Sequence, residues 1–405
     1  MPDSPASNRP SDHKFTVSVV VAVCLLVAAV LMPWYLWPGN WLSPEQEAIQ
    51  TLISDDDEMG GVIYGWERIE PVDEQTAPGN FVMKALYGEN YASHAVIVRT
   101  WEQSAETLAA SLVHLPKLER LELHDCELNV EVAKALLSRP ELKHIFFAGN
   151  PPSPEVLEVL SKGKQIEELL FAGVPVTDAQ LAAIGKFPNL KEVYLAESNG
   201  TDEGLAKLAQ AHSLESLTIY KMPQITDEGV SHLKNLTQLK YLTLPNSQIT
   251  AKSLTIVPHM PQLITLQMSC LPSDDDTTIP TEKIWPNLPE LIDLQLDASC
   301  IDDEDLAAIA KLPNIKILTL FNPNITDNGV AQLAQARKLL TVDLRGTHIS
   351  DAGLKPLAQL PQLIVIDITT DRNIQLETVG EADVDYEPFD PNGPRPRFES
   401  PHDGW

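Results

Sequence analysis

Acidic, histidine and cysteine side chains are spread along the 405 residues of this chain without the spacing of a catalytic motif. The chain has no G-x-S-x-G sequence, no H-E-x-x-H sequence, no glycine-rich phosphate loop and no paired C-x-x-C sequences. Such motifs bring together the nucleophile, the base, the metal ligands or the phosphate-binding amides of a reaction. The sequence therefore predicts no catalytic residues, no cofactor and no enzymatic activity.

Two histidines are the best candidates for metal ligands. His124 and His144 lie near Glu122 and Asp125, but they occupy positions four residues apart on neighbouring predicted strands. At the rise of a strand this is roughly 13 Å, which is too far for one metal ion. We therefore expect no metal site at these residues.

An acidic run lies in a segment where the chain is lengthened, at residues 272–287. Asp274, Asp275 and Asp276 resemble part of a calcium-binding loop, but the glycine and the distal glutamate of an EF-hand are missing. A solvated acidic loop is the favoured interpretation, and ion binding by this insertion stays open.

The elements that would position these residues follow a fixed period. The pattern L-x-x-L-x-L occurs eleven times between Leu118 and Ile368, at a spacing of 24 residues with one of 25 and one of 28. A period of this length indicates a solenoid, in which each unit contains a strand and a helix and buries its apolar face against its neighbours.

The second half of each unit also repeats, as in Ile225-Thr-Asp-Glu-Gly-Val230 and Ile349-Ser-Asp-Ala-Gly-Leu354. This is the pattern of a helix start, because the hydroxyl can accept from amides of the first turn and the Asp lies at the positive end of the helix dipole. Leu354, Leu357 and Leu360 then follow at helical spacing. Strands lie about 4.8 Å apart and helices about 10 Å, so the strands must form the inner face of an arc.

With these motifs the chain resembles the leucine-rich-repeat family, and in particular its ribonuclease-inhibitor-like and cysteine-containing classes, over residues 94–375. The resemblance implies an α/β fold, a right-handed horseshoe of about 11 repeats with a parallel inner sheet and convex helices. It implies no particular partner, because such proteins bind many unrelated molecules. The family's Asn or Cys position holds Cys126 and Asn150 but also Val174 and Met222, so we expect no continuous polar ladder.

Residues 15–37 are uncharged and long enough to cross a hydrocarbon layer of about 30 Å, and Trp34, Tyr35 and Trp37 suit a membrane interface. A cleaved signal peptide is the alternative, but the short apolar region followed by small residues is missing. We therefore predict an uncleaved transmembrane helix.

Arg9 and Lys14 precede this segment, and no further Lys or Arg occurs until Arg68. The positive-inside rule then predicts a cytoplasmic tail at residues 1–14 and repeats outside the cytoplasm, as in exported, membrane-anchored proteins of bacterial type. The formal net charge of −28 argues against nucleic acid and anionic membrane surfaces as ligands.

The remaining regions flank the solenoid, which we place at residues 114–375. Residues 43–113, with an extended segment from Ala95 and a helix through Leu108 and Leu112, are predicted to form an N-terminal cap. Residues 376–405 are acidic and rich in Pro and Gly, which predicts a disordered tail, with coverage of the last repeat by its first part as the alternative.

Three cysteines lie outside the apolar N-terminal segment, which is too few for a disulfide framework. Cys126 is expected in the core. Cys270 and Cys300 lie in adjacent repeats at different offsets, so their pairing stays open.

The inner face carries the function in this interpretation. In each strand the residue between the two buried aliphatic positions faces the concavity. The resulting row is Glu122, Phe146, Leu170, Tyr194, Thr218, Thr243, Gln267, Gln295, Thr319, Asp343 and Asp367, which grades from apolar to acidic. The residues expected to bind a partner are Phe146, Leu170, Tyr194, Tyr220, Tyr241 and Phe321.

The sequence thus predicts a membrane-anchored, non-catalytic recognition module that binds a protein through its concave face. The alternative is that the N-terminal cap or a membrane-proximal loop covers Phe146 and Leu170. A cell-wall component or another glycan is the alternative ligand, because Tyr194, Tyr220 and Tyr241 could stack on sugar rings.

Overall fold

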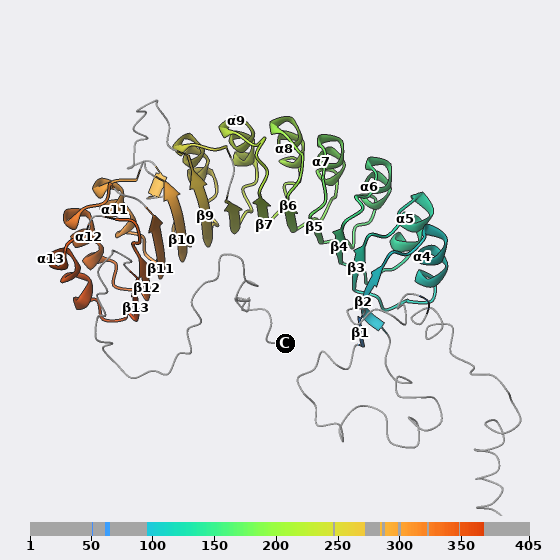
Figure 1. Cartoon of the computed structure of the whole chain (residues 1–405), viewed down its shortest axis with the longest axis horizontal. Coiled ribbons are helices and arrows are strands. Elements are labelled where there is room, and N and C mark those ends of the chain that lie inside the picture. Colours follow the sequence, from blue (N-terminus) through green and yellow to red (C-terminus); the bar gives the residue numbers. More distant parts are fainter. Residues whose placement is uncertain are drawn as a thin grey trace, which may run out of the picture.

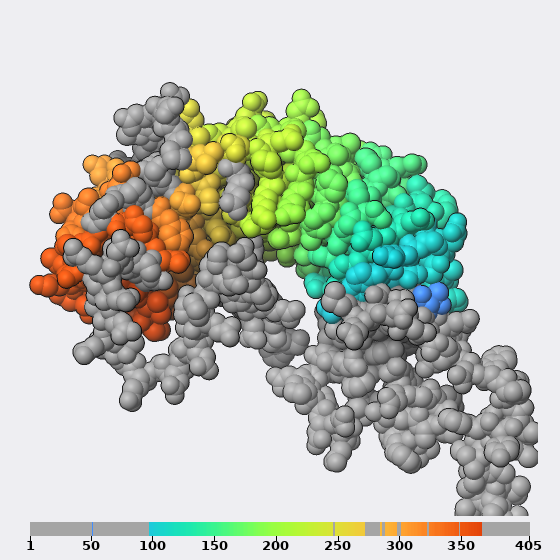
Figure 2. Space-filling view, viewed as in Figure 1, coloured from blue at the N-terminus to red at the C-terminus, as the bar shows by residue number. Residues whose placement is uncertain are grey.

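The computed structural model describes residues 51, 61–64, 95–245, 248–271, 284–285, 288–298, 301–321, 324–347 and 349–367. They form an arc in which strands line the inner side and helices lie on the outer side (Figure 1). The space-filling view shows the same units packed into one continuous curved body (Figure 2). The predicted solenoid with a parallel inner sheet and alternating helices is confirmed.

One sheet of 13 strands runs through the described part of the chain, and its spatial order is the order of the sequence. Strand β1 is antiparallel to β2, and every later neighbour is parallel. The strands are β1 (Gly61–Tyr64), β2 (Ala95–Trp101), β3 (Arg120–His124), β4 (His144–Ala148), β5 (Glu168–Ala172), β6 (Glu192–Ala196), β7 (Ser216–Tyr220), β8 (Tyr241–Leu244), β9 (Thr265–Cys270), β10 (Asp293–Ala298), β11 (Ile317–Phe321), β12 (Thr341–Asp343) and β13 (Val365–Asp367).

The outer helices are short. The α-helices are α4 (Ala105–Leu112), α5 (Val130–Leu137), α6 (Pro154–Leu160), α7 (Asp178–Ile184), α8 (Asp202–Leu208), α9 (Asp227–Ser231), α11 (Asp303–Ile309), α12 (Asp327–Gln332) and α13 (Asp351–Leu354). Tighter 3₁₀ turns are η2 (His232–Asn235), η3 (Ala251–His259), η5 (Leu333–Gln335) and η6 (Leu357–Gln359). The helical run expected through Leu354, Leu357 and Leu360 is split into α13 and η6. The same change from an α-helix to a 3₁₀ turn occurs between α9 and η2 and between α12 and η5.

A further strand and helix precede the first predicted repeat. Strand β2 pairs with β3 in the same parallel register as the later strands, with Trp101 opposite His124, and α4 follows it. The strand and the helix lie where an extended segment and a helix were expected. The extent of the N-terminal cap stays a prediction.

The alternation of each strand separates core from inner face. Leu217 and Ile219 on β7 are fully buried, and Thr218 between them is only half-buried. The same pattern runs from β3 to β7 and recurs in β9 and β11, which confirms the predicted strand register.

The lengthened repeat sends an unexpected side chain into the core. Trp285 is fully buried, and its indole N–H donates to Asp305 Oδ1 at 2.9 Å. Asp305 lies in the first turn of α11 and also accepts from the main-chain N–H of Asp302. The carboxylate therefore anchors the end of the insertion to the solenoid. Asp274, Asp275 and Asp276 lie outside the described residues.

The predicted core role of Cys126 agrees with the structure, since the residue is 2 % exposed and its Sγ lies 3.3 Å from the carbonyl oxygen of His124. Val174 and Met222 are fully buried apolar residues at the corresponding positions, so the polar ladder is interrupted there. Cys300 lies outside the described residues, and its pairing with Cys270 stays open.

Where the structure describes the chain, no helix is long and apolar enough to cross a membrane. The predicted transmembrane segment 15–37 and the predicted tail 376–405 fall outside those residues. Both stay predictions.

Candidate interaction surface on the concave face

The predicted inner row exists as a line of adjacent residues. Phe146 pairs with Leu170 and Leu170 with Tyr194 across neighbouring parallel strands. The row continues through Thr218 to Thr243 and onward to the last strand. Because every strand pair is in register, residues one repeat apart in sequence lie side by side in space.

A second row, two positions further along each strand, flanks the first. Ala148, Ala172 and Ala196 pair with one another on β4, β5 and β6. Ala148 and Ala172 are half-buried and Ala196 is only 6 % exposed, and all three side chains are shorter than those of the first row beside them. We call the following six residues the apolar surface: Phe146, Leu170, Tyr194, Ala148, Ala172 and Ala196. The sequence analysis considered only large apolar residues on the inner face and therefore missed the three alanines.

Aromatic stacking extends the apolar surface toward the N-terminal end of the arc. The ring centroids of Trp101 and His124 lie 4.4 Å apart, and the two rings are stacked at an interplanar angle of 11°. The ring centroids of His124 and Phe146 lie 5.3 Å apart. Burial lowers the pKa of His124, so the imidazole is neutral at pH 7 and stacks as an uncharged ring. Trp101 was missed as a site residue because it precedes the first recognised repeat.

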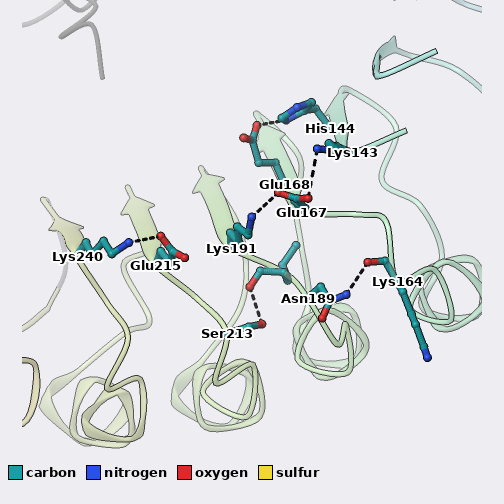
Figure 3. Close-up of polar contacts among 11 residues, drawn as sticks. Lys143, His144, Lys164, Glu167, Glu168, Asn189, Lys191, Ser213, Glu215 and Lys240 are labelled. Carbon is teal, nitrogen blue, oxygen red and sulfur yellow. Dashed lines mark hydrogen bonds and ion pairs between the residues drawn. The ribbon is translucent and has the colours of Figure 1, made fainter. Parts of the chain in front are cut away.

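Charged residues border the apolar surface on the other side. His144 Nδ1 lies 2.5 Å from Glu168 Oε2, at the distance of an ion pair but without the alignment of a hydrogen bond (Figure 3). An Arg120 guanidinium nitrogen lies 3.5 Å from the same carboxylate oxygen. Arg99 Nε donates to Glu122 Oε2 at 2.7 Å. These pairs connect repeats that are one or two units apart.

Glu192 continues this border on β6, between Glu168 on β5 and Ser216 on β7. Burial raises the pKa of its carboxyl group and the neighbouring Glu168 charge raises it further, whereas Arg120 and His144 lower it by less. None of the described residues donates a hydrogen bond to Glu192 or forms an ion pair with it.

A ladder of alternating charges lies just before the strands, as Figure 3 shows. Glu167 contacts Lys143 at 3.6 Å and Lys191 at 2.7 Å, and Glu215 contacts Lys240 at 2.6 Å. These side chains are partly exposed, so each pair contributes roughly 0–1 kcal/mol. The ladder links repeats to one another and leaves little unpaired charge for a partner.

The structure does not bring all six predicted site residues together. Tyr220 pairs with Ala196 and therefore joins the end of the apolar surface, with Lys221 Nζ 5.1 Å from its ring centre. Tyr241 is 38 % exposed but belongs to the row of Glu192. Tyr220 and Tyr241 are thus four positions apart along neighbouring strands, or about 13 Å.

Phe321 lies on β11, five strands away from β6, and the Arg345 guanidinium covers its ring at 4.9 Å. Arg345 also forms an ion pair with Asp343 at 2.7 Å, and Asp343 is only 8 % exposed. The expected acidic end of the face is therefore partly neutralised by a neighbouring arginine.

Thr243 differs from its expected environment. It lies in the inner row as predicted, but it is 9 % exposed rather than open to solvent. Its neighbours in the row are Thr218 on β7 and Gln267 on β9. Orientation toward the concavity therefore does not guarantee exposure.

Asp293 is a second carboxylate with a shifted pKa on the C-terminal half of the face. It is 9 % exposed, and burial raises the pKa of its carboxyl group to about 6. Its described hydrogen-bond donor is the Gln295 amide, 3.2 Å away. Across the parts of the chain that the structure describes, no group of three or more His, Cys, Asp and Glu side chains is placed to hold a metal ion.

The family match and the first solved structure described below agree with the fold. The sequence family described as "Leucine Rich repeat" matches residues 335–358. A chain in the crystal structure of the Rad7 and Elc1 complex in yeast is similar, with a TM-score of 0.50 and 19 % identity over 67 % of this chain and 75 % of that one. An internalin from Listeria monocytogenes str. 4b F2365 aligns with a TM-score of 0.41 and 20 % identity over 68 % of this chain and 87 % of that one.

A search of curated proteins found no match. The repeat pattern, the parallel sheet with alternating helices and the solved neighbour together define a leucine-rich-repeat solenoid.

Proposed function

We propose that this chain is a non-catalytic recognition module that binds a protein partner through its concave face. The observation that supports this function best is the apolar surface, extended by Trp101, His124 and Tyr220. Aromatic and aliphatic side chains on a rigid sheet are typical of interface hot spots, because they bury much area with little loss of conformational freedom. The yeast neighbour is itself named as part of a two-protein complex.

Membrane anchoring is part of the proposal. Residues 15–37 would hold the chain in the membrane and the repeats would lie on the extracytoplasmic side, in a bacterial-type protein with ribonuclease-inhibitor-like or cysteine-containing repeats. The uncharged segment and the positions of Arg9 and Lys14 support this arrangement. Protease added to intact cells should digest the repeats while the N-terminal segment stays attached. Full protection, or a mature chain starting near residue 40, would contradict it.

Site-specific cross-linking tests the binding face. A photoreactive residue at Leu170 of the full-length chain should cross-link a protein in cells, whereas the same residue at Glu203, on the exposed side of α8, should not. Equal cross-linking at both positions would argue against a concave-face site. A product that contains sugar instead of protein would favour the glycan alternative.

Affinity for the cross-linked protein then tests the aromatic residues. Tyr194→Ala combined with Tyr220→Ala should weaken binding by about 2 kcal/mol, or roughly 30-fold, without changing the melting curve. The matched control is Val113→Ala, which removes an apolar side chain that is 56 % exposed at the end of α4, away from the inner rows. If the Tyr194→Ala/Tyr220→Ala variant binds with unchanged affinity, the binding site does not include these two residues.

A further inference from the structure

The border of the apolar surface contains a carboxylate, that of Glu192, for which no described residue forms a direct ion pair; Arg120 and His144 act on it only at longer range. Its acidic neighbour Glu168 contacts His144 and Arg120. Glu122, which lies on β3 in the row of Phe146, accepts a hydrogen bond from Arg99. Glu197, which directly follows the C-terminal end of β6, forms an ion pair with Lys221 at an N···O distance of 3.0 Å. Glu192 has no such contact with any described residue, although it lies in the middle of these pairs.

Position and environment make Glu192 suited to contact a ligand. It lies two residues before Tyr194 on β6, so both side chains are on the inner face, and both are half-buried. Partial burial removes water from the carboxylate, and Glu168 adds a like charge. A cation from outside would offset both effects, and a charge-assisted hydrogen bond in such a setting is stronger than one on an open surface.

The apolar surface and Glu192 together define the chemistry of a complementary ligand. We propose that the protein partner carries a lysine or arginine that pairs with Glu192, next to an apolar side chain that packs against Leu170 and Tyr194. The ligand class is therefore a basic, apolar protein segment. The formal charge of −28 would steer such a segment toward this chain. This inference rests on the proposed concave-face function and narrows it.

Selection of short random peptides displayed on phage, with the full-length chain as bait, tests the proposal. Peptides selected on the natural chain should be enriched in Lys and Arg and in aromatic or aliphatic residues relative to the starting library. Selection on Glu192→Gln should keep the apolar enrichment and lose the basic one. The substitution is close to isosteric, so the inner face keeps its shape.

Binding measurements with individual selected peptides give the contribution of Glu192 to affinity. A selected basic peptide should bind Glu192→Gln at least about tenfold more weakly than the natural chain, because a hydrogen bond to a charged group is lost. Glu203→Gln is the matched control, since it removes the same charge from the exposed side of α8 and should leave affinity unchanged. An equal loss in both variants would show a general effect of net charge and overturn the proposal.

The outcomes separate this inference from the function on which it rests. Peptides that need Tyr194 and Tyr220 but show no basic enrichment, or keep it on Glu192→Gln, would overturn the pairing with Glu192 and leave the concave-face function standing. Peptides that bind the Tyr194→Ala/Tyr220→Ala variant unchanged would contradict the proposed function itself. A selection on the natural chain that enriches no residue type would contradict both.

Discussion

Asp178, at the start of α7, accepts two hydrogen bonds from Thr201, which occupies the N-cap position of α8 in the next repeat. The main-chain N–H of Thr201 lies 2.7 Å from Oδ1 and its hydroxyl 2.8 Å from Oδ2. The same relationship recurs in the pairs Asp202–Thr226, Asp227–Thr250, Asp303–Thr326 and Asp327–Ser350. The Thr-Asp pair of the repeat therefore connects consecutive units, in addition to starting each helix.

Removal of this carboxylate should destabilise the solenoid locally. Asp178→Ala leaves the Thr201 N–H and hydroxyl without their acceptor, and we expect a loss of about 1–3 kcal/mol. Hydrogen exchange at the Thr201 amide measures the local loss of stability, and the thermal unfolding midpoint measures the global loss. Glu203→Ala is the control, because Glu203 also lies in the first turn of a helix and is exposed, and no described residue donates a hydrogen bond to it. Equal losses of stability in the two variants would mean that the interaction with the helix dipole alone accounts for the contribution of Asp178.

The glycine of the motif should be energetically coupled to this Asp. A Cβ at Gly204 would lie 2.3 Å from Asp178 Oδ1, so Gly204→Ala should cost about 1–3 kcal/mol through overpacking. In the Asp178→Ala background that extra cost should fall by about 1 kcal/mol, which a double-mutant cycle measures. Gly173→Ala offers the contrast, because its added Cβ meets nothing within 4 Å and only its φ of +61° is unfavourable. Additive Gly204 and Asp178 effects would contradict the contact.

Stability should depend on pH through Asp293. Its folded-state pKa is raised from 3.8 to about 6, so the protonated form favours the folded state below pH 4, and this contribution is lost as the pH rises through about 6. At pH 7–8, Asp293→Asn should therefore stabilise the protein by up to about 3 kcal/mol, and at pH 4 by almost nothing. Urea unfolding across this pH range measures the difference.

Asp351→Asn controls for the change in net charge, because Asp351 is exposed. If Asp293→Asn instead lowers stability at pH 7–8, the hydrogen bonds from Gln295 outweigh the cost of burying the charge.

The loss of stability caused by three substitutions on neighbouring strands should increase with the burial of the substituted residue. Leu242→Asp buries a carboxylate at a fully buried position and should cost several kcal/mol. Thr218→Asp, on the half-buried inner row, should cost little. Thr243→Asp should fall between them, because Thr243 faces the concavity but is only 9 % exposed. Melting temperatures measured side by side test the order, and a Thr243→Asp midpoint equal to that of Thr218→Asp would contradict the observed shielding.

The period of the sequence determined the architecture and the order of the inner row. A strand alternates its side chains, and parallel strands one repeat apart pair in register, so the adjacency of Phe146, Leu170 and Tyr194 follows from spacing alone. The helix starts were also predictable, because a hydroxyl before an Asp is a local signal.

Only the tertiary structure decided which side chains of different repeats meet. The stacking of Trp101 on His124, the bonds from Thr201 to Asp178 and the covering of Phe321 by Arg345 each join residues about one repeat apart. Such contacts depend on side-chain rotamers and on the curvature of the sheet, which no single repeat encodes. Burial on the inner face depends in the same way on the neighbours of each residue, and for that reason the charge of Glu192 stands out only in the folded solenoid.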